Sequence, residues 1–332
     1  MAVAWIRRLF IRAIDLLFGT FLYVPLGVLF FKRSLSGFGN GEWDSSLIPD
    51  LHGKVAVVTG GNAGIGYHTV RQLAAKGAKV YLAARSEHRA NEAIKRLLNE
   101  NPSIPEDNVV WLPLDLSNQT QVAGAAREIL AKTDRHIGHW TLTYGLLPLL
   151  KATAAQKGSD VRVVTLSSSG ERNNSRQNYF NSLKDLDDPC ASPGWEDSCL
   201  AQSKRYGTSK LANILFAKEL QRRMDEDGVG ITSLSVNPGT IRTEGAADVV
   251  PFVVRPLVWL LFTEPAKGAD ATLFAATAEE VKRDSERWKG KYLDGPGTIK
   301  TPSPKAWDDV IARNLWNITA TAVQNTGALD VI

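Results

Sequence analysis

Cysteine is scarce in this 332-residue sequence, which contains only Cys190 and Cys199. Two thiols and no recognisable secretion signal favour a reducing compartment, so we expect no disulfide framework. Internal repeats and low-complexity segments are also lacking, which excludes solenoids and similar architectures. Because 44% of the residues are hydrophobic, the chain can bury one large core.

An excess of charge of one sign is lacking outside the first 33 residues. The formal net charge is +4, but those 33 residues contain five basic side chains against Asp15 alone. Setting these six residues aside leaves 34 basic and 34 acidic residues. A neutral domain does not offer the basic surface that binds nucleic acid, so we expect no nucleic-acid partner.

Long uncharged apolar runs are lacking except near the N-terminus. Residues 16–31 are apolar and uncharged, which approaches the length of about 20 residues that spans a bilayer as a helix. Basic Lys32 and Arg33 follow in place of a small-residue cleavage site, which favours an anchor over a cleaved signal. We predict a membrane anchor over residues 1–35 and a Gly- and Ser-rich linker over 36–50.

A glycine-rich segment follows the apolar run from Val55 to Val58. A strand that reverses into a helix while its backbone approaches a pyrophosphate needs positive φ or a missing Cβ, here at Gly60, Gly64 and Gly66. The helix N-terminus then presents unpaired N–H groups to the phosphates. A tight turn is the alternative, but an amphipathic helix and a second strand at 79–83 follow, which predicts a βαβ unit.

A tyrosine and a lysine lie four residues apart at Tyr206 and Lys210. On a helix these positions share a face, so the ammonium would favour the phenolate form needed for acid–base work. A surface pair at helical spacing is the alternative. The predicted strand at 161–166 ends in hydroxyls at Ser167, Ser168 and Ser169, and catalytic groups are expected at the carboxyl ends of such strands.

Together these motifs resemble the short-chain dehydrogenase/reductase family, and most closely its retinol-dehydrogenase-like and WW-domain-oxidoreductase-like branch. The resemblance extends from about Leu51 to Tyr292. It implies that Tyr206 exchanges a proton with the substrate oxygen, that Ser168 orients this oxygen, and that Lys210 assists Tyr206 and bonds the nicotinamide ribose. Further matching segments are Asp115-Leu116, His136-Ile137-Gly138-His139-Trp140, Leu211-Ala212-Asn213, Asn237-Pro238-Gly239-Thr240 and Gly290-Lys291-Tyr292.

The resemblance also implies a set of cofactor contacts. Asp115 would accept a hydrogen bond from the adenine, and residues 238–243 would hold the nicotinamide carboxamide. Ser167 and Ser169 are expected to serve in packing and in the turn. The expected cofactor-binding residues are Gly60, Asn62, Gly64, Ile65, Gly66, Arg85, Asp115, Leu116, Tyr206, Lys210, Pro238, Gly239, Thr240, Ile241 and Thr243.

Charge after the second strand indicates which cofactor is used. Enzymes that bind NAD place a carboxylate about 20 residues past the turn, where it bonds the ribose 2′-hydroxyl. This sequence has Arg85 between Ala84 and Ser86, and a guanidinium can bond a 2′-phosphate in bidentate fashion. A solvated loop cation is the alternative. We predict NADP as the cofactor. His136 and His139 share a helix face, but no third ligand is evident, so we expect no metal site.

The sequence departs from the family pattern between Lys132 and His136. The family has a fourth strand ending in Asn-Asn-Ala-Gly here, and we estimate that about 40 residues are missing. Arg135 stands where the family has a catalytic asparagine. Loss of a central strand leaves interior backbone groups unpaired, at about 1–3 kcal/mol for each group. Either the strands on both sides of the gap pair directly, or the chain is an impaired isoform or a misjoined gene product.

We therefore predict an α/β fold with a Rossmann-type doubly wound parallel sheet whose fourth strand is deleted, over residues 51–300, and a C-terminal extension over 301–332. The expected activity interconverts an alcohol and a carbonyl on a small apolar, lipid-, retinoid- or steroid-like substrate with NADP(H). An inactive membrane-associated scaffold is the alternative. The expected location is the endoplasmic reticulum membrane or a lipid droplet, with the catalytic domain in the cytosol.

Overall fold

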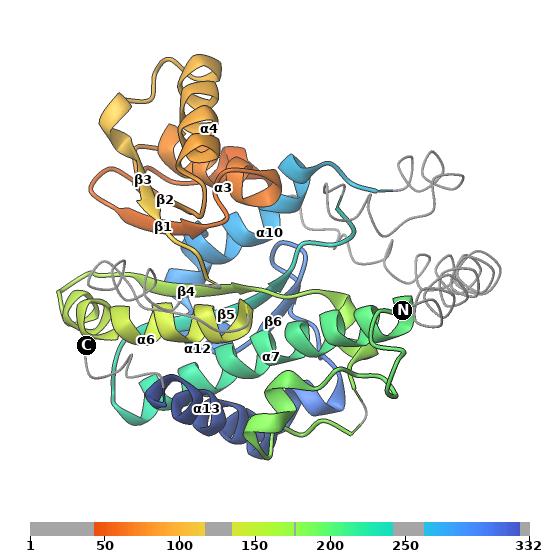
Figure 1. Cartoon of the computed structure of the whole chain (residues 1–332). Coiled ribbons are helices and arrows are strands. Elements are labelled where there is room, and N and C mark those ends of the chain that lie inside the picture. The colour runs from red at the N-terminus through yellow and green to blue at the C-terminus, as the bar shows by residue number, and fades with distance from the viewer. Residues whose placement is uncertain (1–42, 117–134, 176, 242–261, 326–332) are drawn as a thin grey trace, which may run out of the picture.

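The computed structural model describes residues 43–116, 135–175, 177–241 and 262–325 (Figure 1). The predicted anchor at 1–35 lies outside these ranges. Within them, no helix combines the length and the apolar character that a membrane crossing requires. The anchor therefore stays a prediction. Residues 43–50 do contact the domain, because Trp43 packs edge-on against Phe274 and Ile48 is buried.

Strands and helices alternate along the chain. The strands are β1 (Val55–Thr59), β2 (Lys79–Ala84), β3 (Val109–Pro113), β4 (Val161–Leu166), β5 (Ile231–Asn237) and β6 (Tyr292–Asp294). The α-helices are α3 (Gly64–Ala75), α4 (Glu87–Glu100), α6 (Arg135–Ala154), α7 (Cys199–Glu226), α10 (Pro265–Thr277), α11 (Glu279–Arg283), α12 (Ser285–Trp288) and α13 (Asp309–Gln324). Short 3₁₀ helices are η3 (Ser45–Leu47), η4 (Glu106–Asn108), η5 (Ser169–Asn173), η6 (Leu183–Asp187) and η8 (Pro304–Trp307).

The described strands form two parallel sheets of three strands each. The first has the order β1-β2-β3, with Val55 opposite Lys79 and Val80 opposite Val109. The second has the order β4-β5-β6, with Val161 opposite Ile231. The α/β class with parallel strands is thereby confirmed.

A single continuous sheet is not formed by the described strands. β1 and β4, which flank the sequence gap, end up in different sheets, so the strands on the two sides of the gap do not pair directly. β1 is the end strand of its sheet, so its outer edge has no strand partner among the described residues. Parallel sheets are normally covered on both faces, whereas Val55 and Val57 of β1 are 66% and 40% exposed.

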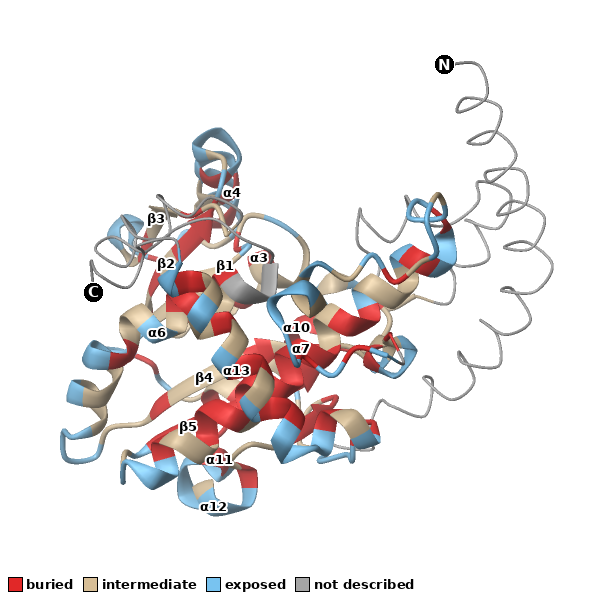
Figure 2. Cartoon of the chain, turned by 60° about the horizontal axis from the view of Figure 1, so that its bottom comes forward, coloured by how far each residue is buried: buried red, intermediate tan, exposed pale blue. Residues whose placement is uncertain are grey.

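Apolar clusters cover each sheet, and one cluster spans both, because Ala83 of β2 packs with Trp140 of α6 and Ile231 of β5. In the first sheet, α3 buries Val70 and Leu73 against Val80 and Leu82 of β2, as the periodicity of the sequence predicts. In the second, β5 is buried at every position and α7 covers it, and Figure 2 shows that buried residues concentrate in these two elements. The helical faces of α4 and α12 that point outward are exposed.

Helix α10 connects the two sheets. Its Ala269 and Leu273 belong to the core of the first sheet, whereas Phe274 and Ala275 belong to a core cluster of the second. The buried guanidinium of Arg162 on β4 donates to the carbonyls of Ala275 and Ala278 at 3.1 and 3.0 Å. Figure 1 shows α10 lying between the sheets, so this helix holds them together despite the gap.

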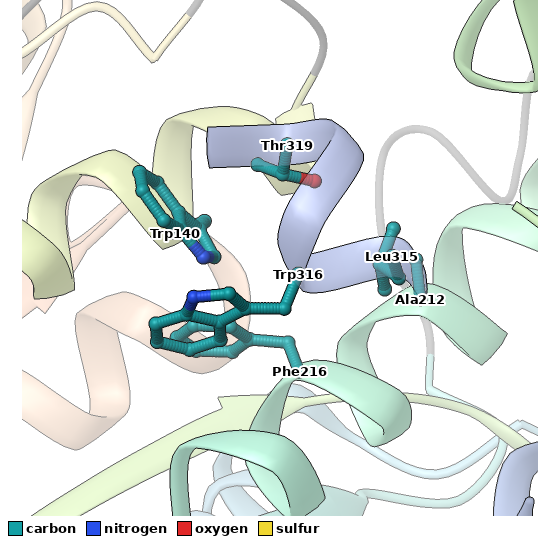
Figure 3. Close-up of a pocket in the computed structure, with 6 residues that line it drawn as sticks. All are labelled: Trp140, Ala212, Phe216, Leu315, Trp316 and Thr319. Carbon is teal, nitrogen blue, oxygen red and sulfur yellow. The ribbon is translucent and has the colours of Figure 1, made fainter. Parts of the chain in front are cut away.

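Helix α13 covers α6 and α7 with a cluster of aromatic rings. Trp316 stacks on Phe216 of α7 at 6.0 Å between ring centroids and meets Trp140 of α6 edge-on at 5.3 Å. Figure 3 shows these rings with Thr319 and Leu315 around a cavity of about 10 Å³, which holds about one water. The C-terminal extension is thus part of the core, and this cavity is too small for a substrate.

Candidate active site

The glycine-rich turn has the backbone geometry that the sequence predicts. Gly60 and Gly64 have φ of +65° and +53°, values that residues with a Cβ rarely adopt. A Cβ at Gly66 would clash with the carbonyl of Gly60, so the helix can start this close to the strand only with glycine there. Ala63 at the N-cap of α3 makes no side-chain cap hydrogen bond. The first N–H groups of α3 therefore suit an anion.

The expected adenosine contacts lie at the same edge of the first sheet. Arg85 directly follows β2 and is exposed, whereas Ala84 before it is buried. Asp115 and Leu116 follow β3 and are half-buried. Because the three strands are parallel, these residues and the glycine turn after β1 share the carboxyl edge. Asn62 and Ile65, also half-buried, lie within that turn.

Ser168, Tyr206 and Lys210 come together at the carboxyl end of β4. A Cβ added at Gly170 would lie 3.0 Å from Cε1 of Tyr206 and 3.4 Å from Oγ of Ser168, so the serine hydroxyl and the tyrosine ring border the same small space. Nζ of Lys210 lies 5.5 Å from the centroid of the Tyr206 ring. Tyr206 is 52% exposed, so its phenol is accessible to a substrate.

Hydrogen bonds to the end of β4 fix the lysine side of this group. Lys210 donates through Nζ to the carbonyl of Leu166 at 3.3 Å, and Asn213 donates to the same oxygen at 2.9 Å. Ser167 is buried and donates to the backbone carbonyl of Lys210 at 2.8 Å. The hydroxyl of Ser167 is therefore used in packing β4 onto α7, whereas Ser168 is half-buried and Ser169 is exposed.

The loop after β5 adds a second wall. Asn237, Pro238 and Gly239 form a turn in which Gly239 has a φ of +84° and its N–H donates to the side chain of Asn237 at 3.2 Å. The amide of Asn237 donates to the carboxylate of Asp294 at 2.6 Å. Thr240 and Ile241 continue this turn, and Ile241 pairs with Thr263. Thr243 lies outside the described residues.

Two buried ionisable groups, Tyr292 and Glu171, have raised pKa values. Burial raises the pKa of Tyr292, and the negative charges of Asp294 and Glu171 add to this effect. Burial likewise raises the pKa of Glu171, although two hydrogen bonds from Ser303 oppose the change. Tyr292 therefore stays a neutral phenol, and Tyr206 is the accessible one.

The sequence analysis assigned no role to three residues near the site. Gly207 leaves room for the carbonyls of Gly170 and Asn173, which a Cβ would clash with. Asn213 shares an acceptor with Lys210, and Glu171 is fully buried three residues after Ser168. A glycine directly after Tyr206 and a carboxylate inside an otherwise small, polar turn were the available signals.

Comparisons with known proteins identify the family of this chain. The family model described as short chain dehydrogenase matches residues 54–138. A short chain dehydrogenase/reductase of Colletotrichum higginsianum is 72% identical over 99% of this chain and 90% of its own length. One from Gibberella zeae is 62% identical over 99% of both chains. The bovine dehydrogenase/reductase SDR family member 13 is 33% identical over 81% of this chain and 73% of its own.

Solved structures share the fold. A protein of Mycobacterium paratuberculosis is similar with a TM-score of 0.61 and 24% identity, over 85% of this chain and 97% of its own. A short chain dehydrogenase of Escherichia coli, solved with NADPH, has a TM-score of 0.52 and 20% identity, over 76% of this chain and 98% of its own. At these identities the likeness concerns the fold.

The length of one alignment bears on the sequence gap. The alignment with the Colletotrichum protein extends over 359 positions, whereas this chain has 332 residues. That relative therefore contains residues without a counterpart in this chain. The alignment length does not place these residues along the chain, so the segment expected before His136 stays a prediction.

Proposed function

The chain belongs to the short-chain dehydrogenase/reductase family, and from that premise we propose that it is an NADP(H)-dependent oxidoreductase that interconverts an alcohol and a carbonyl on an apolar substrate. The observation that carries the proposal is the grouping of Ser168, Tyr206 and Lys210 at the carboxyl end of β4. Parallel α/β sheets place their active sites at this edge.

The residues of the first sheet fit a phosphorylated dinucleotide. Gly60, Gly64 and Gly66 leave open backbone at the start of α3, where Cβ atoms at the first two would meet nothing within 4 Å. Arg85 would pair with a 2′-phosphate, and no carboxylate stands at the neighbouring Ala84. NADP(H), when bound, supplies or accepts the hydride.

The chain's own groups handle the proton and the position of the substrate. Tyr206 would donate a proton to the carbonyl oxygen during reduction, and would take it back from the hydroxyl during oxidation. Ser168 would donate a hydrogen bond to that oxygen and orient it. Lys210, held by the Leu166 carbonyl, would lie beside the phenol and bond the nicotinamide ribose; its Nζ is 5.5 Å from the centroid of the Tyr206 ring.

The apolar character of the substrate rests on the resemblance to the retinol-dehydrogenase-like branch. Two apolar side chains are exposed shortly before Tyr206 in the sequence: Trp195, which precedes α7, is 38% exposed, and Leu200 in the first turn of α7 is 46% exposed. We further propose that residues 1–35 hold the enzyme on the endoplasmic reticulum membrane or a lipid droplet with the catalytic domain in the cytosol; the support for this is the apolar run at 16–31.

A second function has its own supporting observation. β1 and β4 lie in separate sheets, so the wall that a central strand would supply between the two halves of the site is not built by the described strands. A protein in this state could keep its surfaces and its NADPH site and yet lack turnover. That alternative is a non-catalytic, membrane-associated scaffold.

Turnover separates the two functions. The full-length chain is assayed by NADPH absorbance with bulky apolar ketones and aldehydes, and with the corresponding alcohols and NADP⁺. Carbonyl-dependent NADPH oxidation supports the oxidoreductase. Tight NADPH binding without turnover in either direction across the panel would instead support the scaffold.

A further inference from the structure

We propose that Glu171 is a positioning residue of this active site, which acts through Ser303 to fix the turn that carries Ser168 and packs against Tyr206. The inference rests on the proposed function. It assigns a role in the reaction to a carboxylate that would not touch the substrate.

Glu171 is completely buried and accepts its side-chain hydrogen bonds from a distant part of the chain, while Nε of the neighbouring Arg172 lies 3.7 Å from its carboxylate. Its relative exposure is 0%. The backbone N–H of Ser303 donates to one carboxylate oxygen at 2.9 Å, and the Ser303 hydroxyl donates to the other at 2.5 Å. The two residues are 132 positions apart. Two donors that converge on one buried carboxylate fix its position more narrowly than a single bond does.

The backbone of Glu171 belongs to the turn that holds Ser168. Its N–H donates to the carbonyl of Ser168 at 3.1 Å, and the N–H of Gly170 donates to the Ser168 hydroxyl at 3.1 Å. Ser168 is the N-cap of η5, and Glu171 lies inside that short helix. A shift of the Glu171 side chain would therefore move the Ser168 hydroxyl directly.

The same turn contacts the tyrosine helix closely. Gly207, next to Tyr206, approaches the carbonyls of Gly170 and Asn173 so closely that no Cβ fits between them. The Tyr206 ring borders Gly170. A displacement of η5 consequently changes the distance between Ser168 and Tyr206, because nothing in this packing can yield without moving backbone.

The C-terminal segment that bears Ser303 is itself held at several points. Arg172 donates to the carbonyl of Thr301 at 2.9 Å. Lys305 donates to the carbonyls of Ser175 and Asn178 at 2.8 and 2.9 Å. The segment 301–305 is thus hydrogen-bonded to residues between 171 and 178 at several points, and the bonds between Glu171 and Ser303 are the buried ones among them.

A purely structural role for Glu171 can be distinguished with a matched control. Glu219 is also a buried carboxylate, 1% exposed, and it accepts hydrogen bonds from Arg222 and Arg223 at 2.8 Å. It lies 13 residues beyond Tyr206 on α7, which corresponds to about 20 Å along a helix. Glu219→Gln should weaken folding without any effect on the geometry of Ser168 and Tyr206.

The test compares Glu171→Gln, Glu171→Ala, Ser303→Ala and the double variant Glu171→Gln/Ser303→Ala with Glu219→Gln in the full-length chain. At saturating NADPH, kcat should fall by at least about tenfold in Glu171→Ala, since misplacement by about 1 Å can cost about 100-fold in rate. Glu171→Gln keeps one hydrogen-bond acceptor, so its kcat should fall less than that of Glu171→Ala. The Kd of NADPH should change much less than kcat in all of them, because the phosphate-binding turn and Arg85 lie on the other sheet, although Tyr206 and Lys210 are expected to contact the nicotinamide ribose.

Two further readouts separate positioning from stability. Glu171 and Ser303 should show coupling, so that the double variant is no worse than the poorer single one. The NMR signal of the Tyr206 ring, from ¹³Cζ-labelled tyrosine and assigned by its loss in Tyr206→Phe, should shift in the folded Glu171 variants and stay in place in Glu219→Gln.

The outcomes are distinct from those of the proposed function. A wild-type chain without turnover overturns the oxidoreductase, and the Tyr206 signal then decides the role of Glu171 by itself. Folded Glu171 variants with an unmoved Tyr206 signal would overturn the positioning role, as would an active wild type whose kcat is lowered no more by Glu171→Ala than by Glu219→Gln.

Discussion

The hydroxyl of Thr59 lies 3.3 Å from Nε2 of His139, although 80 positions separate the two residues. Thr59 ends β1 at the glycine-rich turn, and His139 lies in the first turns of α6. Gly138, its neighbour, approaches the carbonyl of Leu116 after β3 so closely that a Cβ would lie 2.7 Å from that oxygen. The start of α6 therefore reaches the carboxyl edge of the first sheet directly after the sequence gap.

Insertion of a family-type strand between Asp134 and Arg135 should stabilise the chain. A strand placed between β1 and β4 would pair the backbone groups on the facing edges of both strands, which lie in different sheets. We expect the present chain to show a broad thermal transition and weak turnover, and the extended one a sharper, higher transition with NADPH-dependent activity. Calorimetry and activity assays on both chains measure this.

One result would contradict the expected benefit of the inserted strand. A cooperative transition of the present chain above about 55 °C, within the usual range for mesophile domains, together with robust carbonyl reduction, would show that the two sheets form a competent site without the strand.

Arg85→Ala should weaken NADPH binding and leave NADH binding unchanged. The guanidinium is expected to pair with the 2′-phosphate, which NADH lacks. A loss of about tenfold or more in NADPH affinity is expected for a charge-assisted contact. Fluorescence titration with both cofactors measures the ratio, and Arg89→Ala, an exposed arginine on the following helix, serves as the control. Equal affinities of the wild type for NADPH and NADH would contradict the choice of NADP.

Tyr206→Phe should remove nearly all turnover with little loss of cofactor affinity. The substitution deletes only the hydroxyl proposed to exchange the proton, and the ring can keep its place against Gly170. Steady-state kinetics and NADPH titration are measured in a form with activity, either this chain or the strand-restored one. Tyr179→Phe, another exposed tyrosine, provides the control. If the Tyr206 variant keeps most of its activity, the assigned proton transfer is wrong.

Deletion of residues 1–35 should release the protein from membranes. About 16 apolar residues buried in a bilayer hold a chain through the hydrophobic effect, which salt does not screen. The full-length chain should therefore sediment with vesicles or lipid droplets at high salt, and the shortened chain should stay in the supernatant. A full-length chain that washes off in high salt has no apolar anchor.

The parts of the fold that depend on neighbouring residues could be predicted from the sequence. β1, the glycine turn, α3 and β2 follow from local periodicity and from the φ values that Gly60 and Gly64 supply. The shared helix of Tyr206 and Lys210 was likewise predictable, since α7 includes both. In each case the residues that allow the prediction lie within about 30 positions of one another in the sequence.

The contacts that complete the site could not be predicted this way. Asn237 meets Asp294 across 57 positions, and Glu171 meets Ser303 across 132. No periodicity relates such residues, because their meeting depends on how β5, β6 and the C-terminal segment pack. Whether β1 and β4 pair across the sequence gap could not be predicted either, because it depends on how α6 and α10 pack against the two sheets.

The aromatic cluster under α13 gives the protein an optical signature of its own. Trp140 and Trp316 lie 5.3 Å apart between centroids with planes at 69°, and both are buried. Two indoles this close and inclined to one another couple their electronic transitions, which produces a paired band in circular dichroism that isolated tryptophans do not give. The band depends on α13 remaining docked on α6. Its intensity therefore reports the attachment of the C-terminal helix in the unlabelled protein.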